Sequence, residues 1–99
     1  MALEISYSPL FFESLEAIFT FYDERNGSDR YSRHLLKCLL EETQRISQMP
    51  TIGSPSTRPD VRFFYMMGFT IIYRYNSRRM TILSIRSSAR KPLKIYKLK

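Results

Sequence analysis

Apolar and polar residues alternate with two different periods in the first half of this chain, and each period predicts one kind of secondary structure. Leu3, Ile5 and Tyr7 alternate with polar residues, which is typical of a short half-buried strand. Apolar residues then recur at spacings of three and four in two segments, which predicts two amphipathic helices. Their apolar stripes are Phe11, Leu15, Ile18 and Tyr22 in the first helix, and Tyr31, Leu35, Leu39 and Ile46 in the second.

Short polar signals mark where these helices begin and end. Ser8-Pro9 predicts a helix start, because a serine oxygen can accept from a first-turn amide and proline suits the first helical position. Asn26-Gly27 predicts the end of that helix, since both residues tolerate the left-handed conformation. Ser28 or Asp29 can cap the next helix, so the connection is short and the two helices form an antiparallel hairpin.

The second half of the chain predicts strands. Residues 49–60 contain three prolines and a glycine among serines and threonines, which is typical of a loop inside a domain. Three strand-like runs follow, over residues 61–66, 69–75 and 80–85. The turn signals Met67-Gly68 and Asn76-Ser77 separate them, and links this short make consecutive strands antiparallel.

Together these elements predict an α+β fold in a single domain over residues 1–99. An N-terminal strand leads into an antiparallel two-helix hairpin, and a three-stranded antiparallel meander follows. The simplest arrangement packs both helices on one face of a four-stranded sheet, because each helix has one apolar stripe. The tail, residues 93–99, is compatible with a strand, a helical turn or a flexible segment.

The charge of the chain, +7 over 99 residues, is divided unequally between its halves. Residues 1–57 hold five basic and eight acidic residues, a balance of −3. Residues 58–99 hold eleven basic residues and one acidic residue, a balance of +10. Such asymmetry attracts a polyanion, an acidic protein or an anionic membrane surface at long range, and it does not choose among them.

Several classes of protein are excluded or disfavoured by composition. A single cysteine and a single histidine, Cys38 and His34, rule out a disulfide framework and leave no set of metal ligands. Cys38 lies among four leucines and is expected in the core. The most apolar stretch is too short to span a bilayer, and residues 1–8 lack signal-peptide features. We expect a cytoplasmic protein with no metal and no cofactor.

Arginines and tyrosines are the chemically active groups of the second half. Arginine can neutralise a phosphate or a developing negative charge, and tyrosine can stack on a base or exchange a proton. We expect the arginines to gather on the sheet face opposite the helices, although packing and solubility explain any one of them equally well. The set comprises Arg62, Arg74, Arg86, Arg90 and Lys91, with Tyr65, Tyr73, Tyr75 and Tyr96.

In its ordered motifs the chain resembles the RelE/ParE toxin superfamily of bacterial toxin-antitoxin systems, over residues 3–92. The resemblance rests on the strand entering Ser8-Pro9, the two amphipathic helices and the segments that follow them. These segments are Met49-Pro50-Thr51-Ile52-Gly53-Ser54-Pro55, Val61-Arg62, Ile71-Ile72-Tyr73-Arg74, Ile82-Leu83-Ser84-Ile85 and Arg90-Lys91-Pro92. The resemblance implies a type II toxin, a growth inhibitor neutralised by a cognate antitoxin.

Two activities are known in that superfamily. RelE-like members cleave messenger RNA, generally in the ribosome, whereas ParE-like members inhibit DNA gyrase. Arg62 matches a basic position of the nuclease pattern, Arg90 and Tyr96 can fill two more, and Thr70 stands where an arginine would be expected. The incomplete set favours the ParE branch, with an mRNA endonuclease or a non-toxic basic binding module as alternatives. Whether the chain is an enzyme is left open.

The resemblance also places the partner surfaces. Basic residues would contact the target, which is DNA gyrase or the ribosome with its mRNA. These are Arg62, Arg74, Arg86, Arg90, Lys91 and Lys94. Apolar residues of the tail would bind the antitoxin by strand addition or helix packing. These are Leu93, Ile95, Tyr96 and Leu98. No membrane partner is expected, and a homodimer or a heterotetramer with the antitoxin is possible.

Overall fold

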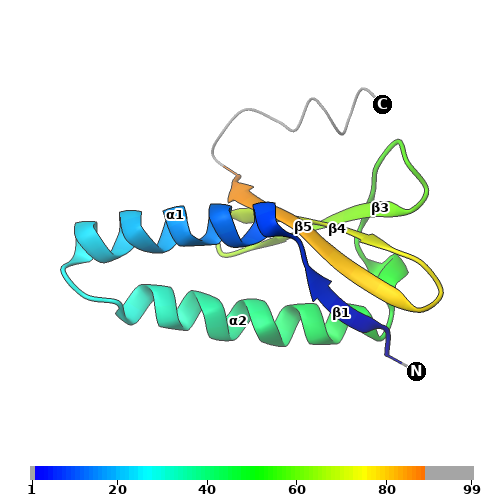
Figure 1. The fold of residues 1–99 in the computed structure, drawn as a ribbon, viewed down its shortest axis with the longest axis horizontal. Coiled ribbons are helices and arrows are strands. Elements are labelled where there is room, and N and C mark those ends of the chain that lie inside the picture. Colours follow the sequence, from blue (N-terminus) through cyan, green and yellow to red (C-terminus); the bar gives the residue numbers. More distant parts are fainter. Residues whose placement is uncertain (1, 89–99) are drawn as a thin grey trace.

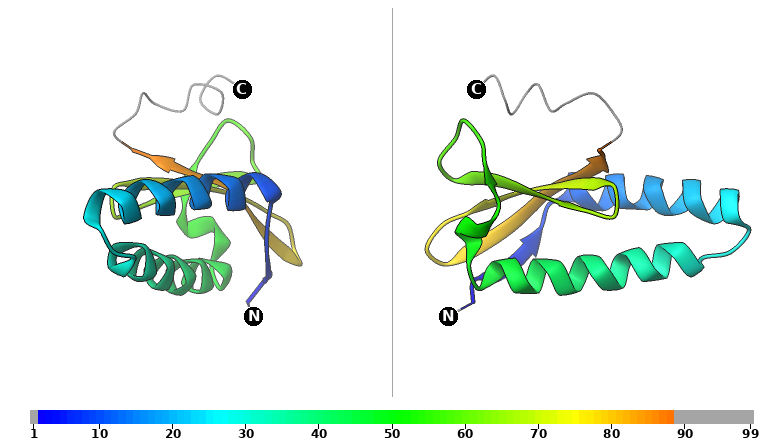
Figure 2. Two further views of the ribbon diagram at one scale, coloured as in Figure 1. Left: turned by 60° about the vertical axis from the view of Figure 1, so that its left-hand side comes forward. Right: turned by 180° about the vertical axis from the view of Figure 1, so that it is seen from behind.

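The computed structural model describes residues 2–88 and builds them into one mixed sheet and a helical hairpin (Figure 1). The five strands lie in the order β1-β5-β4-β3-β2. Both helices lie on one side of the sheet, and the hairpin projects beyond it (Figure 2). In chain order the elements are β1 (Glu4–Tyr7), α1 (Pro9–Asn26), α2 (Arg30–Ser47), the 3-10 helix η1 (Pro50–Ile52), β2 (Ser54–Pro55), β3 (Val61–Met66), β4 (Phe69–Tyr75) and β5 (Arg79–Ser87).

Ser8 begins α1, as its sequence context predicted, and it also fastens the helix to the sheet. Its Oγ accepts a hydrogen bond from the Phe11 amide at 3.1 Å and donates one to the Leu83 carbonyl at 2.7 Å. Pro9 occupies the first helical turn, where its missing N–H costs nothing. Gly27 ends the helix with a φ of 69°, and its amide bonds to the Asp23 carbonyl. The predicted limits of α1 are therefore confirmed, whereas Asp29 occupies the N-cap position of α2 without a side-chain cap hydrogen bond.

The predicted antiparallel meander is confirmed, and the sheet has one strand more than expected. β3, β4 and β5 pair in antiparallel succession, and a register shift between Ile72 and Tyr73 leaves Leu83 of β5 without an opposite residue in β4. β1 pairs in parallel with β5, from Glu4 opposite Arg79 to Tyr7 opposite Ile82. The additional strand is β2, which pairs with β3. Two residues within a proline-rich loop have no detectable alternation, so the sequence gives no signal for this strand.

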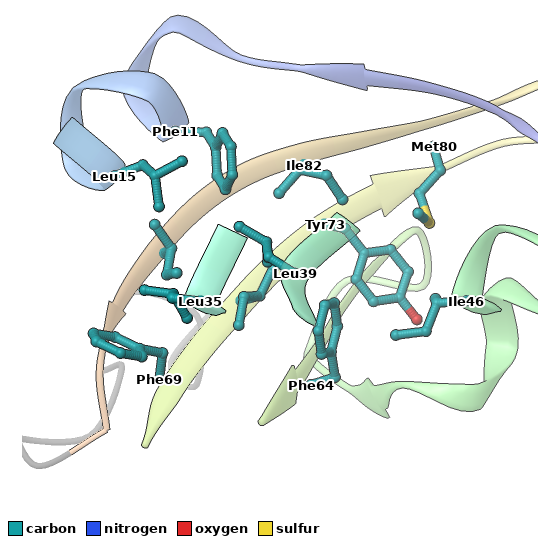
Figure 3. Packing of buried hydrophobic residues seen from close by; sticks show 12 residues of the cluster. Phe11, Leu15, Leu35, Leu39, Ile46, Phe64, Phe69, Tyr73, Met80 and Ile82 are labelled. Atoms are coloured by element: carbon teal, nitrogen blue, oxygen red, sulfur yellow. The ribbon is translucent and has the colours of Figure 1, made fainter. Parts of the chain in front are cut away.

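The core lies between the helices and the covered sheet face (Figure 3). Leu35, Leu39 and Ile46 of α2 are fully buried, which confirms the predicted stripe. α1 buries only Phe11 and Leu15 among its apolar residues. The sheet contributes Phe64, Phe69, Ile71, Tyr73, Met80, Ile82 and Ile85.

The double role of Ser8 can be measured. Replacing Ser8 by alanine removes the helix cap and the bond to the β5 carbonyl together, so we expect the free energy of unfolding to fall by about 1–2 kcal/mol. Chemical denaturation monitored by circular dichroism measures this change. Ser28→Ala, at an exposed position in the hairpin turn, is the control and should change stability by less than about 0.5 kcal/mol. Equal stability of the two variants would contradict the assignment.

Candidate functional site

Arg62 lies on the helix side of the sheet, apart from the other arginines of the strands. In the register of β3 and β4 it stands opposite Tyr73, a core residue, and it shares that face with Phe64. Its Nη1 donates a hydrogen bond to the Gly53 carbonyl at 2.8 Å. Its Nε is buried and has no hydrogen-bond partner within residues 2–88. The guanidinium is therefore engaged with the backbone that follows η1.

The side chain of Tyr73 also binds this backbone segment. Its ring is fully buried, and its hydroxyl donates to the Pro50 carbonyl at 2.6 Å and accepts from the Gly53 amide at 3.1 Å. A Cβ at Gly53 would lie 2.3 Å from the Tyr73 hydroxyl oxygen, which explains why this position is glycine. We call Arg62, Tyr73, Pro50 and Gly53 the loop clamp. It fixes the path of the chain from α2 to β2.

Burial also influences the protonation of the Tyr73 hydroxyl. The pKa of Tyr73 is raised above its ordinary value near 10, because burial penalises the phenolate. The Gly53 amide and the positive charge of Arg62 oppose this shift without cancelling it. The phenol is therefore neutral at physiological pH and serves as a structural hydrogen-bonding group.

Arg74 and Arg86 lie on the opposite sheet face, as expected. Arg74 stands opposite Val61 and Thr81 in the strand register, whereas Arg86 stands opposite Thr70. Arg74 is exposed and Arg86 is half-buried. Arg86 is paired with Thr70, which lies four residues before Arg74 in β4. The two arginines are therefore roughly 14 Å apart along the strand direction. The expectation of one gathered set of arginines is thus right about the face for these two, and wrong for Arg62.

A pair of aromatic rings shares the face of Arg74 and Arg86. The Phe63 and Tyr65 ring centroids are 5.7 Å apart in an edge-to-face arrangement, and Tyr65 is 65% exposed. Phe63 was missed as a surface residue because β3 carries apolar residues on both faces, which hides the alternation. Tyr65 of β3 and Arg86 of β5 are both paired with Thr70 of β4, so the three residues lie side by side across the sheet.

The remaining predicted site residues are in the tail. Arg90, Lys91, Leu93, Lys94, Ile95, Tyr96 and Leu98 all lie outside the described residues, so their proposed contacts with a target or an antitoxin stay predictions.

The position of Cys38 differs from the one that the sequence predicted. Cys38 is half-buried and its Sγ lies 3.7 Å from Nε2 of His34, on an exposed part of α2. It was expected in the core, but the helical stripe turns Leu35 and Leu39 inward and leaves Cys38 at the side.

Residues 2–88 contain no cluster of three potential metal ligands. None of their helices is long and apolar enough to cross a membrane.

Comparison with known proteins identifies the family. The family model for the ParE toxin of the type II toxin-antitoxin system parDE matches residues 5–92. The chain belongs to the ParE toxin family. As a member it is the toxin of a type II system, and its partner is an antitoxin.

A solved structure supports the fold of this ParE family member. It is described as the chromosomal ParDE TA system from P. aeruginosa, and its matching chain is 20% identical with a TM-score of 0.74. The match covers 87% of this chain and 96% of that one. No curated protein sequence matches the chain.

Gly53→Ala tests the loop clamp. The new methyl group collides with the Tyr73 hydroxyl, so we expect a loss of about 1–3 kcal/mol in the free energy of unfolding. Chemical denaturation measures this loss. In a Tyr73→Phe background the same substitution should cost less, because the nearest atom is gone. Equal costs in both backgrounds would show that the two residues are not coupled.

The raised pKa of Tyr73 predicts how stability depends on alkaline pH. Its folded-state pKa exceeds its unfolded value near 10, so the neutral phenol stabilises the fold fully below that pH. This contribution is lost as the pH rises from about 10 through the folded-state pKa. Between pH 9 and 11 we therefore expect the wild-type free energy of unfolding to fall more steeply than that of Tyr73→Phe. Parallel curves would refute this role of Tyr73.

Proposed function

We propose that this toxin inhibits DNA gyrase by protein contact and does not cleave nucleic acid. The observation that carries the proposal is the position of Arg62. This arginine, the best match to a nuclease position, bonds to the Gly53 carbonyl on the helix side of the sheet. An arginine that stabilises charge at a scissile phosphate must instead face the substrate together with its partners. In residues 2–88, Arg62 faces away from both Arg74 and Arg86.

The sheet face opposite the helices is the target surface in this proposal. It combines the exposed Tyr65 and its neighbour Phe63 with the cations Arg74 and Arg86. Aromatic and arginine side chains contribute most of the affinity at many protein interfaces. Their wide spacing suits a protein surface better than a single phosphate. The charge of +10 over residues 58–99 would also accelerate association with an acidic surface.

A supercoiling assay with purified gyrase and toxin tests this proposal. We expect the wild-type toxin to inhibit supercoiling, and Arg74→Ala/Arg86→Ala to inhibit about tenfold more weakly, the equivalent of about 1.4 kcal/mol of binding. Arg78→Ala is the matched control, since it removes an exposed cation from the turn between β4 and β5. Supercoiling that continues at toxin concentrations sufficient to stop growth would overturn the proposal.

The alternative is a RelE-like endonuclease, and one observation favours it. Arg86 and the exposed Tyr65 share a sheet face on which RNA could lie, and Arg90 and Tyr96 could complete the set with Arg62. Mapping RNA ends after induction separates the two activities, because a nuclease creates new cuts positioned by codons. Growth that stays normal without an antitoxin would instead indicate a non-toxic binding module.

A further inference from the structure

A small polar pocket lies where β4 turns into β5, at the end of the sheet far from the α1–α2 turn (Figure 1). Its volume is about 320 Å³. Arg74 and Thr81 stand opposite each other in the strand register, and Arg79 lies two positions before Thr81 on the same face of β5. The lining comprises Asp60, Arg74, Tyr75, Asn76, Arg79 and Thr81. The pocket therefore lies at one end of the target surface proposed above.

The turn between the two strands fixes the side chain of Asn76. Its Oδ1 accepts hydrogen bonds from the amides of Arg78 and Arg79, at 2.8 and 2.9 Å. The backbone amide of Asn76 donates to the Arg79 carbonyl at 2.9 Å. The side-chain nitrogen of Asn76 has no partner within residues 2–88, so its two N–H donors remain for a ligand in the pocket.

Arg74 adds a cation without a partner of its own. Its guanidinium is exposed and forms no ion pair or hydrogen bond with another residue between 2 and 88. Arg79 is already engaged, because its Nε and Nη2 both donate to Oε1 of Glu4, at 3.2 and 2.8 Å. Asp60 brings a carboxylate to the lining, and its Oδ2 lies 3.3 Å from Nη2 of Arg58. The pocket thus offers more unused donors than acceptors, which favours an oxyanion.

We propose that this pocket binds a single carboxylate side chain of the partner protein, held by the Arg74 guanidinium and the Asn76 side-chain amide. The inference rests on the proposed function, which gives the toxin a protein target, and it names the group that this end of the target surface recognises. A planar guanidinium presents paired N–H donors that match the two oxygens of a carboxylate.

The neighbouring acids favour a lone carboxylate over a nucleic-acid backbone. Asp60 lies in the lining, and Glu4 of β1 binds Arg79, another lining residue. A nucleic-acid strand presents a row of charged phosphates, and some of these would meet the two carboxylates. One partner carboxylate carries a single charge and needs only the donors of Arg74 and Asn76.

Binding of acetate to the full chain, followed by NMR at constant ionic strength, tests this site without gyrase. We expect saturable shift changes at Nε of Arg74 and Nδ2 of Asn76, and Arg74→Gln should weaken acetate binding about fivefold. Arg86→Gln is the matched control, because it removes a positive charge from the other end of the same face and should change the affinity by less than about twofold.

Two further substitutions separate the pocket from general attraction by a basic chain. Asn76→Asp keeps an oxygen for the two turn amides and replaces the free N–H donors by a carboxylate oxygen, so acetate binding should weaken about fivefold. Asp60→Asn removes the negative charge of the lining, so acetate binding should strengthen about twofold. Backbone NMR spectra of both variants check that the turn is retained.

Three outcomes would overturn the proposal. Shift changes that never saturate, or an equal loss in Arg74→Gln and Arg86→Gln, would show charge screening without a site. Dimethyl phosphate, which has the single charge of a phosphodiester, is the comparison ligand, and tighter binding than acetate would assign the pocket to nucleic acid. None of these readouts involves gyrase, so a failure of the carboxylate site is distinguishable from a failure of the proposed function.

Discussion

The parallel pairing of β1 with β5 is the contact on which the whole arrangement depends. It joins residues 75 positions apart, such as Ser6 and Thr81, whose hydroxyl groups lie 3.0 Å from each other. Parallel strands require a long crossover connection, and here that connection comprises α1, α2, η1 and the strands β2, β3 and β4. The loop-closure entropy is large, so this edge must be secured by side chains as well as by the ladder. Ser8 provides such a contact where β1 gives way to α1.

The shortness of β1 has a second consequence. A longer first strand would have covered the whole edge of β5, and α1 would then have started further along it. Because the chain turns at Ser8, α1 runs beside the second half of β5 (Figure 2), and Leu10 and Phe21 of α1 are each 55% exposed. The same turn therefore closes the core and leaves a groove between α1 and β5.

Burial decides which polar residues remain available for partners. Tyr73 and Arg62 occupy the core side of the sheet, where they satisfy the carbonyls and amide of the η1 segment. A buried hydroxyl must find such partners, because an unsatisfied polar group in the core is costly. Arg74 and Arg86 carry the same guanidinium group as Arg62 on the opposite face, away from the main core cluster. Residues of one type are thus divided between a structural role and a surface role.

The sequence by itself determined the order and type of the elements apart from η1 and β2, the limits of α1, the hairpin and the inner meander. These depend on local patterns: periodicity, the Ser8-Pro9 start and the glycine turns at Gly27 and Gly68. Only the tertiary structure decided the parallel β1–β5 edge, the pairing of β2 and the face on which Arg62 lies. Each of these depends on contacts between distant residues, and one step of strand register moves a side chain to the other face. The residues of a strand do not by themselves determine the register in which it pairs with a distant strand.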